Sequence, residues 1–357
     1  MIKKFIILAN FILLNLFSNN SEKKLIICGI AKDIGNGSYV TIDSCEKLFT
    51  YLHDYRVIIY ENNSSDDTKK ILGTWAQNNS KIKFISEDLN DEFKKAHGLC
   101  TVPYSTVDRI NLISRARNIV LDETLKKEYE EFPYLMMVDL DTAPWDIKGI
   151  IETLDNKDYS WDAVVSNGLY DSFAYRDEDC PIGWEIIGSC FWEGLSKGEY
   201  NSRKDYLTKT KHWKRVISGF GGLAIYKRNS IKNARYSAYI TKNLEKILTK
   251  AIYKKINAPP KEKRENLKHT PFLAEYLKKT RRMPCYRIND KYIHADSSKG
   301  VIIDSLCKAG EICWFGIDLG NPRPWTCEHI NFHADMIADG FDRIYFNPLL
   351  ISNQLPN

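Results

Sequence analysis

The chain has 357 residues, 43% of them apolar and 12% aromatic, which excludes disorder over its whole length and allows a sizeable core. Its 51 lysines and arginines against 46 aspartates and glutamates give a formal charge of +5. This excess is too small to indicate a protein that binds nucleic acid over its whole surface, so we expect no nucleic-acid partner. One large domain, or one with a smaller appendage, is expected.

Residues 1–20 carry two lysines, then the apolar stretch from Phe5 to Phe17, then polar residues, which is the layout of a secretory signal. The stretch is short for a membrane span of ~20 residues, and no clear small-x-small cleavage site follows it. We therefore predict a signal peptide or an uncleaved signal anchor, and a protein that is exported or held in the secretory pathway. The alternative is a buried first helix that happens to be apolar.

Nine cysteines are consistent with an oxidising compartment, although no CxxC pair or evenly spaced framework is present. Cys180 with Cys190, and Cys307 with Cys313, are close enough in sequence to bridge within one loop. Scattered buried thiols are the alternative.

Short apolar runs rich in β-branched residues predict six strands. These runs are residues 24–30, 56–62, 81–86, 134–140, 162–167 and 222–227. The stretches between the early runs that have helical spacing are residues 41–55, 65–79 and 109–132. Strand alternating with helix predicts an α/β fold, a doubly wound, mostly parallel sheet flanked by helices, whose ligands bind at the carboxyl ends of the strands.

After about residue 168 the pattern changes to long aromatic and polar loops, followed by a basic region over residues 229–282. Residues 243–256 of this region have helical spacing. We predict a basic helical insertion that packs on the core. Its alternative role is a surface that contacts anionic lipid or an anionic substrate.

The segment YLMMVDLDTAPWD, residues 134–146, brings Asp139 and Asp141 to the end of an apolar strand. Alternate residues of a strand point to the same face, so the two carboxylates could converge on one cation where the strand frays. Hard oxygen ligands suit Mn²⁺ or Mg²⁺, and such an ion would hold and neutralise a diphosphate. The alternative is that this Asp-x-Asp pair only caps the next helix.

A second acidic strand end lies in IIYENNSSDDT, residues 58–68. Glu61 would lie at the tip of that strand, where a carboxylate can accept hydrogen bonds from a base or a ribose. Asp33, just beyond the first strand, occupies a similar tip and is a weaker candidate for the same role.

The segment SRARN, residues 114–118, lies within a predicted helix. Arg115 and Asn118 are three apart and share a face, whereas Arg117 points elsewhere. An arginine facing the site could hold a phosphate or a sugar hydroxyl, and solvated helix charges are the alternative.

Glycines precede the last predicted strand in SGFGGLAIYKR, residues 218–228. Gly221 and Gly222 would allow a ligand to approach the backbone closely, although a bulge or a tight turn would require the same residues.

The late segment CEHINFHADM, residues 327–336, brings several polar side chains together, among them Glu328. His329 and His333 are four apart and would share a helix face, which could indicate zinc, but the H-E-x-x-H order and a third soft ligand are missing. One of these histidines completing the coordination of the ion at the two aspartates is the simpler interpretation.

Taken in order, these segments resemble the nucleotide-diphospho-sugar glycosyltransferases of the GT-A fold. YENNSSDDT, SRARN, GFGGLAIY and CEHINFHADM resemble, in detail, the fungal capsule-associated α-1,3-mannosyltransferase family. The likeness covers roughly residues 24–230 and 325–348, with the basic region outside it.

The resemblance implies a metal-dependent hexosyltransferase that moves a sugar from a nucleotide-sugar donor to a hydroxyl of a glycan or glycoconjugate acceptor. It implies mannose from GDP-mannose, with Mn²⁺ as the usual metal and Mg²⁺ as the alternative. Glu61 falls where the nucleotide is contacted, and Arg115 where the donor phosphates or sugar are held. The metal positions are Asp139 and Asp141, with His329 or His333 as a late ligand. Members of the family are typically anchored by an N-terminal segment in the secretory pathway.

An inverting enzyme would need a carboxylate base for the acceptor hydroxyl, and Asp171 and Glu193 are the candidates. A retaining enzyme, as expected for capsule-type relatives, would rely on the leaving phosphate instead of such a carboxylate. Two other classes stay open: a catalytically inactive sugar- or nucleotide-binding protein, and a secreted zinc hydrolase centred on His329 and His333.

The predicted organisation has four parts. They are a signal peptide or anchor (1–20), a nucleotide-sugar-binding GT-A core (21–228), a basic helical insertion and acceptor-side region (229–324), and a C-terminal segment that completes the active site (325–357).

Overall fold

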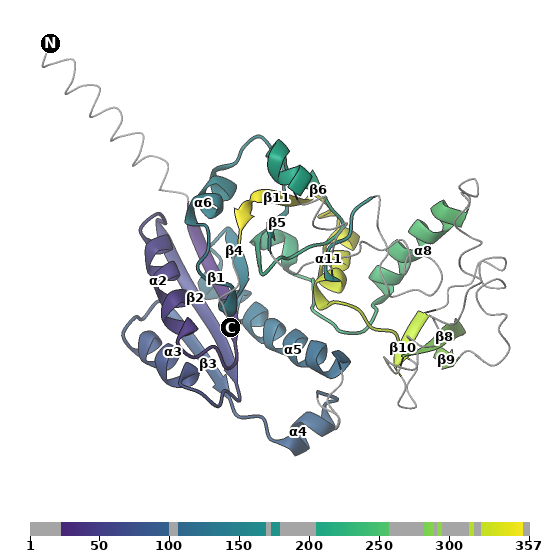
Figure 1. Ribbon diagram of the computed structural model, residues 1–357, viewed down its shortest axis with the longest axis horizontal. Coiled ribbons are helices and arrows are strands. Elements are labelled where there is room, and N and C mark those ends of the chain that lie inside the picture. Colours follow the sequence, from purple (N-terminus) through teal and green to yellow (C-terminus); the bar gives the residue numbers. More distant parts are fainter. Residues whose placement is uncertain are drawn as a thin grey trace, which may run out of the picture.

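The computed structural model describes most of the chain between residues 23 and 352 (Figure 1). The described residues are 23–99, 106–168, 173–178, 205–256, 282–288, 291–294, 314–317 and 323–352. No helix within these ranges is long and apolar enough to cross a membrane. The predicted signal segment, the base candidates Asp171 and Glu193, and the four cysteines expected to form bridges lie outside the described residues.

Eight strands form one sheet in the order β3-β2-β1-β4-β7-β5-β11-β6. Their bounds are β1 (Lys24–Ala31), β2 (Asp54–Asn62), β3 (Ile82–Glu87), β4 (Tyr134–Asp139), β5 (Ala163–Asn167), β6 (Lys214–Arg215), β7 (Leu223–Lys227) and β11 (Ile344–Ile351). Strands β3, β2, β1 and β4 are parallel, β7 is antiparallel to β4 and β5, and β11 is again parallel to β5. The predicted α/β, doubly wound, mostly parallel sheet is confirmed.

Helices cover both faces of this sheet (Figure 1). Their bounds are α2 (Gly37–Phe49), α3 (Thr68–Gln77), α4 (Asp91–Ala96), α5 (Thr106–Thr124), α6 (Ile147–Asp155), α8 (Lys242–Ile256) and α11 (Glu328–Ala338). Alternate strand residues point to opposite faces, so Leu25 and Ile27 of β1 pack with α2, α3 and α6, whereas Ile26 and Cys28 pack with α5 and α11. The result is a helix–sheet–helix sandwich with a core on each side.

The strand register brings the polar strand ends to one edge of the sheet. Ala31 of β1 is paired with Glu61 of β2, which is paired with Ser86 of β3, and Ile30 is paired with Asp139 of β4. The carboxyl ends of four adjacent strands therefore meet along this edge, where ligands of doubly wound sheets bind.

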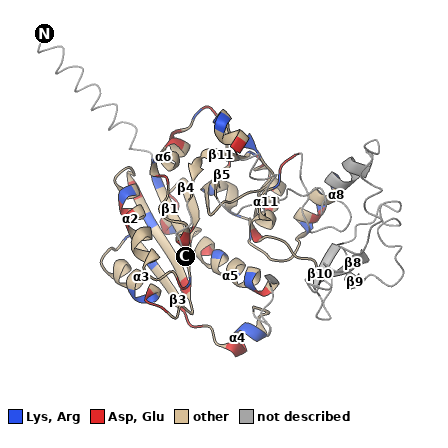
Figure 2. Ribbon diagram, viewed as in Figure 1, with Lys and Arg blue, Asp and Glu red and all other residues tan. Residues whose placement is uncertain are grey.

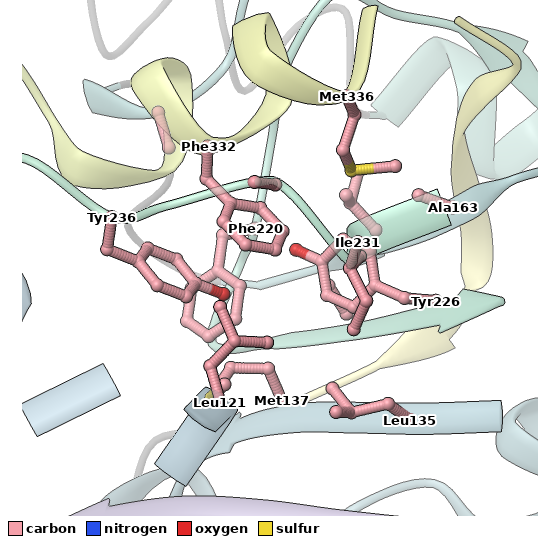
Figure 3. Packing of buried hydrophobic residues seen from close by; sticks show 14 of the residues in the cluster. Leu121, Leu135, Met137, Ala163, Phe220, Tyr226, Ile231, Tyr236, Phe332 and Met336 are labelled. Carbon is pink, nitrogen blue, oxygen red and sulfur yellow. The ribbon is translucent and has the colours of Figure 1, made fainter. Parts of the chain in front are cut away.

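Helix α11 packs over the part of the sheet that contains β4, β7 and β5 (Figure 3). Phe332 and Met336 point from the helix toward the sheet. The ring of Phe332 stacks on Tyr236 with centroids 4.2 Å apart and meets Tyr226 of β7 edge-on at 5.4 Å. The C-terminal segment is therefore part of the core of this sheet.

The basic region contains the predicted helix, α8, which buries Leu244 and Leu248. After it, still within the predicted part 229–324, comes a three-stranded antiparallel sheet in the order β10-β8-β9, with bounds β8 (Arg282–Ile288), β9 (Lys291–His294) and β10 (Trp314–Ile317). Positive and negative side chains are intermixed over the described helices, in keeping with the small net charge (Figure 2).

The six predicted strands are confirmed, but the helix predicted over residues 109–132 ends at Thr124. There the Nε and Nη2 atoms of Arg228 donate hydrogen bonds to the Thr124 carbonyl oxygen at 3.1 and 3.0 Å. This arginine satisfies a carbonyl group that the helix end leaves unpaired, and the chain turns away. Strands β6 and β11 were not predicted from the sequence.

Candidate active site

Two acidic side chains from neighbouring strand ends hold the turn that follows β2. Glu61 is fully buried, and its carboxylate accepts hydrogen bonds from the backbone N–H of Ser64 (2.7 Å) and the hydroxyl of Ser86 (2.6 Å). Asp33 is exposed, and its Oδ1 accepts hydrogen bonds from the backbone N–H (2.7 Å) and the hydroxyl (3.1 Å) of Ser65. Both carboxylates thus shape one turn at the carboxyl edge, and their contact with a nucleotide stays a prediction.

Arg115 of α5 lies beside the ends of β2 and β3. Its Nη1 donates to the Tyr60 hydroxyl and to Oε2 of Glu87, both at 2.6 Å, and its guanidinium lies 5.4 Å from the ring centroid of Phe93. The hydrogen bond from Arg115 holds the pKa of Glu87 below its usual range. Glu87 therefore balances the charge of this arginine, and its predicted role in holding donor phosphates is untested.

Asn118, predicted to share the ligand-facing side of the helix, bonds to protein backbone. Its Nδ2 donates to the carbonyl of Tyr236 at 2.9 Å, and its Oδ1 accepts from the N–H of the same residue at 3.0 Å. Asn118 thereby fixes the segment around Tyr236 to α5, and a contact with donor remains a prediction.

The Asp-Leu-Asp segment turns sharply at the end of β4. The strand ends at Asp139, and Leu140–Thr142 form a 3₁₀ turn, so the strand argument for two aspartates on one face does not apply. Leu140 is buried against β1 at Gly29, where a Cβ would lie 2.4 Å from the leucine Cδ2. The turn anchors Leu140 in the core and places Asp141 directly after it.

The two carboxylates lie close enough to interact electrostatically. Loss of solvation around the Asp141 carboxyl and repulsion from Asp139 together raise the pKa of Asp141 to about 6. A close pair of oxygen ligands carrying excess negative charge fits a hard divalent cation. Within the described ranges no group of three or more His, Cys, Asp or Glu side chains is placed to hold a metal. Water would complete the coordination of such an ion, as is usual for Mg²⁺ in proteins.

Arg117, which was expected to point away from the ligand, lies between Asp139 and α11. Its Nη2 donates to Oδ1 of Asp139 at 2.7 Å, and its Nε donates to Oε1 of Glu328 at 3.3 Å. The side chain is 3% exposed, and its guanidinium lies 4.6 Å from the ring centroid of Phe220. Burial disfavours the charged form, but the two carboxylates still hold the pKa of Arg117 above its usual range.

The position of Arg117 along α5 carries a signal that the sequence-based prediction did not use. The helix residues that recur at spacings of three and four and are buried are Val107, Ile110, Ser114, Arg117 and Leu121. A charged residue inside such a stripe has to be paired, because burying an unpaired charge is costly. The stripe therefore indicates that Arg117 meets an acidic partner.

Gly221 and Gly222 form a tight turn before β7, with φ angles of 63° and 92°. A Cβ on Gly221 would lie 2.5 Å from the Ser166 carbonyl oxygen, and one on Gly222 would lie 2.7 Å from Cγ2 of Thr142. The Gly222 carbonyl accepts a hydrogen bond from the Asp139 N–H at 2.9 Å. The close approach here is to β5 and to the turn after β4, and contact with a ligand remains a prediction.

The two predicted late ligands, His329 and His333, are buried on α11. The ring nitrogens of His333 lie 3.0 Å from the Ser218 hydroxyl and 3.2 Å from the Tyr226 hydroxyl. The His329 ring stacks on Phe220 at 3.7 Å, and its nitrogens have no hydrogen-bond partner among the described residues. Burial lowers the pKa of both, that of His333 to about 3, so both are neutral at pH 7. Metal binding by either stays a prediction.

A doubly wound sheet with a carboxylate pair at the end of a central strand is the arrangement that the resemblance to glycosyltransferases implied, and the chain is an enzyme of that class. It belongs to the CAP59 mannosyltransferase family, whose model, described as Cryptococcal mannosyltransferase 1, matches residues 41–276. The match includes Asp139 and Asp141. It extends into the basic region beyond residue 230, where the likeness had been expected to end.

The solved structures to which the chain is similar are distant. The mannosyltransferase PcManGT from Pyrobaculum calidifontis, in complex with GDP-Man and Mn²⁺, is 12% identical over 65% of this chain and 52% of its own, with a TM-score of 0.36. Glucosyl-3-phosphoglycerate synthase from Mycobacterium tuberculosis is 11% identical over 79% and 90%, with a TM-score of 0.34. S. aureus TarS, residues 1–349, is 12% identical over 72% and 73%, with a TM-score of 0.33.

The matched region spans about half the length of the first of these structures. Identities and TM-scores this low do not indicate which ligands this chain binds. No curated protein matches the chain.

Proposed function

We propose that this glycosyltransferase moves mannose from GDP-mannose to a hydroxyl of a glycan acceptor, and that it requires Mn²⁺ or Mg²⁺ held by Asp139 and Asp141. The family to which the chain belongs supports the sugar. The observation that carries the metal is the carboxylate pair at the end of β4, in which Asp139 contributes to the raised pKa of Asp141.

A divalent cation at this pair would neutralise the charge that develops on the leaving diphosphate. Three contacts of Asp139 prepare the pair for this cation. Arg117 fixes the carboxylate of Asp139, and the Gly222 carbonyl fixes its backbone N–H. The hydroxyl of Thr142 also donates to the Asp139 carbonyl at 2.6 Å. Asp139 is thus held on both its backbone groups and its side chain before any ligand arrives.

The turn after β2 is prepared in the same manner. Its backbone and hydroxyl groups are fixed by Glu61 and Asp33, so it keeps its shape without a ligand. A turn already ordered binds a nucleotide at a lower entropic cost than a flexible one. This supports placing the nucleoside part of the donor beside β1 and β2 and its diphosphate beside β4.

The test is hydrolysis of a panel of nucleotide sugars by the purified chain, with Mn²⁺ and with chelator, beside an Asp141→Ala variant. We expect Mn²⁺-dependent release of GDP from GDP-mannose, reduced at least roughly 10²-fold in the variant. Asp43→Ala is the matched control, because Asp43 is an exposed carboxylate on α2 that pairs only with Lys47 in the described structure. It should leave the rate unchanged.

Each other outcome corrects a different part of the proposal. Cleavage of another nucleotide sugar would replace the donor. Equal rates with chelator would remove the metal. If a nucleotide sugar bound but was not cleaved, and the variant behaved like the parent, the protein would be an inactive binding protein.

A further inference from the structure

Three charged side chains, of which Arg117 and Glu328 are buried and Asp139 is half-buried, form a bridge from β4 to α11. Arg117 lies at its centre and donates to Asp139 on one side and to Glu328 on the other. The side chains of Arg117, Asp139 and Glu328 are 3%, 18% and 8% exposed. In such surroundings the charges are screened weakly, and each one changes the field at its neighbours.

The balance of charge around the bridge depends on Glu328. With all groups ionised, Asp139, Asp141 and Glu328 contribute three negative charges and Arg117 one positive charge, which leaves −2. Without the charge of Glu328 the sum is −1, and Asp139 is left as the charged carboxylate that Arg117 contacts at 2.7 Å, while Arg117 also attracts Asp141. Arg109 also attracts Asp141, but it is exposed and therefore screened.

We propose that Glu328 is a positioning residue for the metal site. Acting through Arg117, it compensates the buried positive charge, so that Arg117 can orient Asp139 without weakening the hold of Asp139 and Asp141 on a divalent cation. This inference rests on the proposed function, since it concerns the same carboxylate pair.

The contacts of Glu328 favour this indirect role over direct contact with a ligand. Its Oε1 lies 3.3 Å from Nε of Arg117 and 3.4 Å from Nε2 of His329, and its Oε2 accepts a hydrogen bond from the Cys327 thiol at 3.6 Å. The whole residue is 6% exposed. The C-terminal segment would thus contribute a charge to the site and no metal ligand.

The experiment measures Mn²⁺ binding to the full chain without donor, from the electron paramagnetic resonance signal of free Mn²⁺. Glu328→Gln keeps the shape of the side chain and removes its charge. We expect its dissociation constant for Mn²⁺ to rise roughly tenfold, as is typical when a partner of a metal ligand is changed.

A double variant separates charge from packing. Arg117→Met with Glu328→Gln removes one charge of each sign and restores the sum of −2, so it should recover most of the lost affinity. If Glu328 were a ligand, or acted by packing alone, the double variant would bind as weakly as the single one or more weakly. Such a result would overturn the inference.

Folding controls keep these outcomes distinct. Arg343→Met breaks another pair between arginine and a buried carboxylate, at Asp162 near the opposite edge of the sheet, and should leave the Mn²⁺ affinity unchanged. Thermal unfolding without metal shows whether each variant is folded. If Arg117→Met with Glu328→Gln does not fold, Arg117→Lys with Glu328→Gln replaces it. This variant keeps the positive charge, so it should bind Mn²⁺ as weakly as Glu328→Gln does. Recovery of the parent's Mn²⁺ affinity in this variant would contradict the inference.

The parent chain separates the two proposals. Absence of Mn²⁺ binding by the parent would overturn the proposed metal and this inference with it. Normal binding by the parent together with unchanged binding by Glu328→Gln would overturn the inference alone.

Discussion

The two halves of the sheet are built in different ways. In the parallel half, β3-β2-β1-β4, the contacts that shape the ends of β1, β2 and β3 join residues fairly close in sequence, such as Asp33 with Ser65, 32 positions apart. The other half, β7-β5-β11-β6 with α11 packed on it, contains both parallel and antiparallel strands and is called the mixed half here. In the mixed half the corresponding contacts span much longer separations. Arg117 meets Glu328 across 211 positions, and Ser218 meets His333 across 115.

The candidate metal site lies where the two halves meet, between β4 and β7. The peptide N–H of Asp139 is bound by Gly222 from the mixed half, and its carboxylate is bound by Arg117, which Glu328 contacts in turn. The turn after β2 has no such dependence in its described contacts. Changes in the last part of the chain should therefore alter the metal site and leave the turn after β2 intact.

The largest expected effect is that of Asp141→Asn, in the candidate metal site between the two halves of the sheet. Activity should fall at least roughly 10²-fold, while the melting temperature near pH 8 should rise. The folded-state pKa of Asp141 is raised to about 6, so ionisation of Asp141 above that pH lowers the free energy of unfolding. Asparagine carries no charge and avoids this loss.

The comparison that checks this prediction is calorimetry at two pH values. Near pH 8 the Asn variant should melt higher than the parent, and well below pH 6, where Asp141 is protonated in the native state, the difference should shrink. A variant that melts lower at pH 8, or keeps its activity, would contradict the account.

Gly222→Ala tests the dependence on the mixed half. Its φ of 92° and the approach to Cγ2 of Thr142 strain any side chain there, so we expect a loss of about 3 kcal/mol in the free energy of unfolding. Urea denaturation measures this loss, and Mn²⁺ binding should weaken as Asp139 shifts. Unchanged stability would mean that this turn is not fixed as described.

Acid should weaken the mixed half through its buried histidines. The folded-state pKa values of His329 and His333 lie below their usual range, so only the unfolded chain gains protons as the pH falls below about 6.5. The stability present above that pH should fall by roughly 1 kcal/mol for each histidine by about pH 5.5. Urea denaturation of the parent and of His333→Gln over this pH range checks this prediction. The free energy of unfolding should fall less in the variant than in the parent, and equal falls would contradict the prediction.

Gly73→Ala gives the smallest effect and belongs to the parallel half. Gly73 lies within α3, where a Cβ would make ordinary contact with the Phe84 ring at 3.5 Å. Alanine should stabilise the protein by about 0.5–1 kcal/mol in urea denaturation. A destabilised variant would show that the space beside Phe84 is tighter than the structure indicates.

The parallel half of the fold could be predicted from the sequence, because each strand there contains a short apolar run, and β1, β2 and β3 follow one another both along the chain and across the sheet. Strands β6 and β11 could not. β6 has two residues, and β11 contains Pro348 within an irregular register between Phe346 and Ile351. A proline inside a run argues against a strand, so the last part of the sheet was missed.

The site divides in the same way. The positions of Asp33, Glu61 and Asp139 at one edge follow from the rule that parallel strands share their carboxyl ends. The bridge through Arg117 to Glu328 could not be predicted from local spacing, since it depends on the packing of α11 against α5. The buried stripe of α5 indicates that Arg117 has an acidic partner, but not which residue this partner is.

The metal site proposed at Asp139 and Asp141 can be located by anomalous diffraction at the manganese absorption edge, from crystals of the chain grown with Mn²⁺ and GDP. We expect a manganese peak bonded to Asp139 and Asp141, with Glu328 in contact with Arg117 and no bond between the manganese and any residue of α11. A peak bonded to His329 or His333, or one away from the two aspartates, would contradict it.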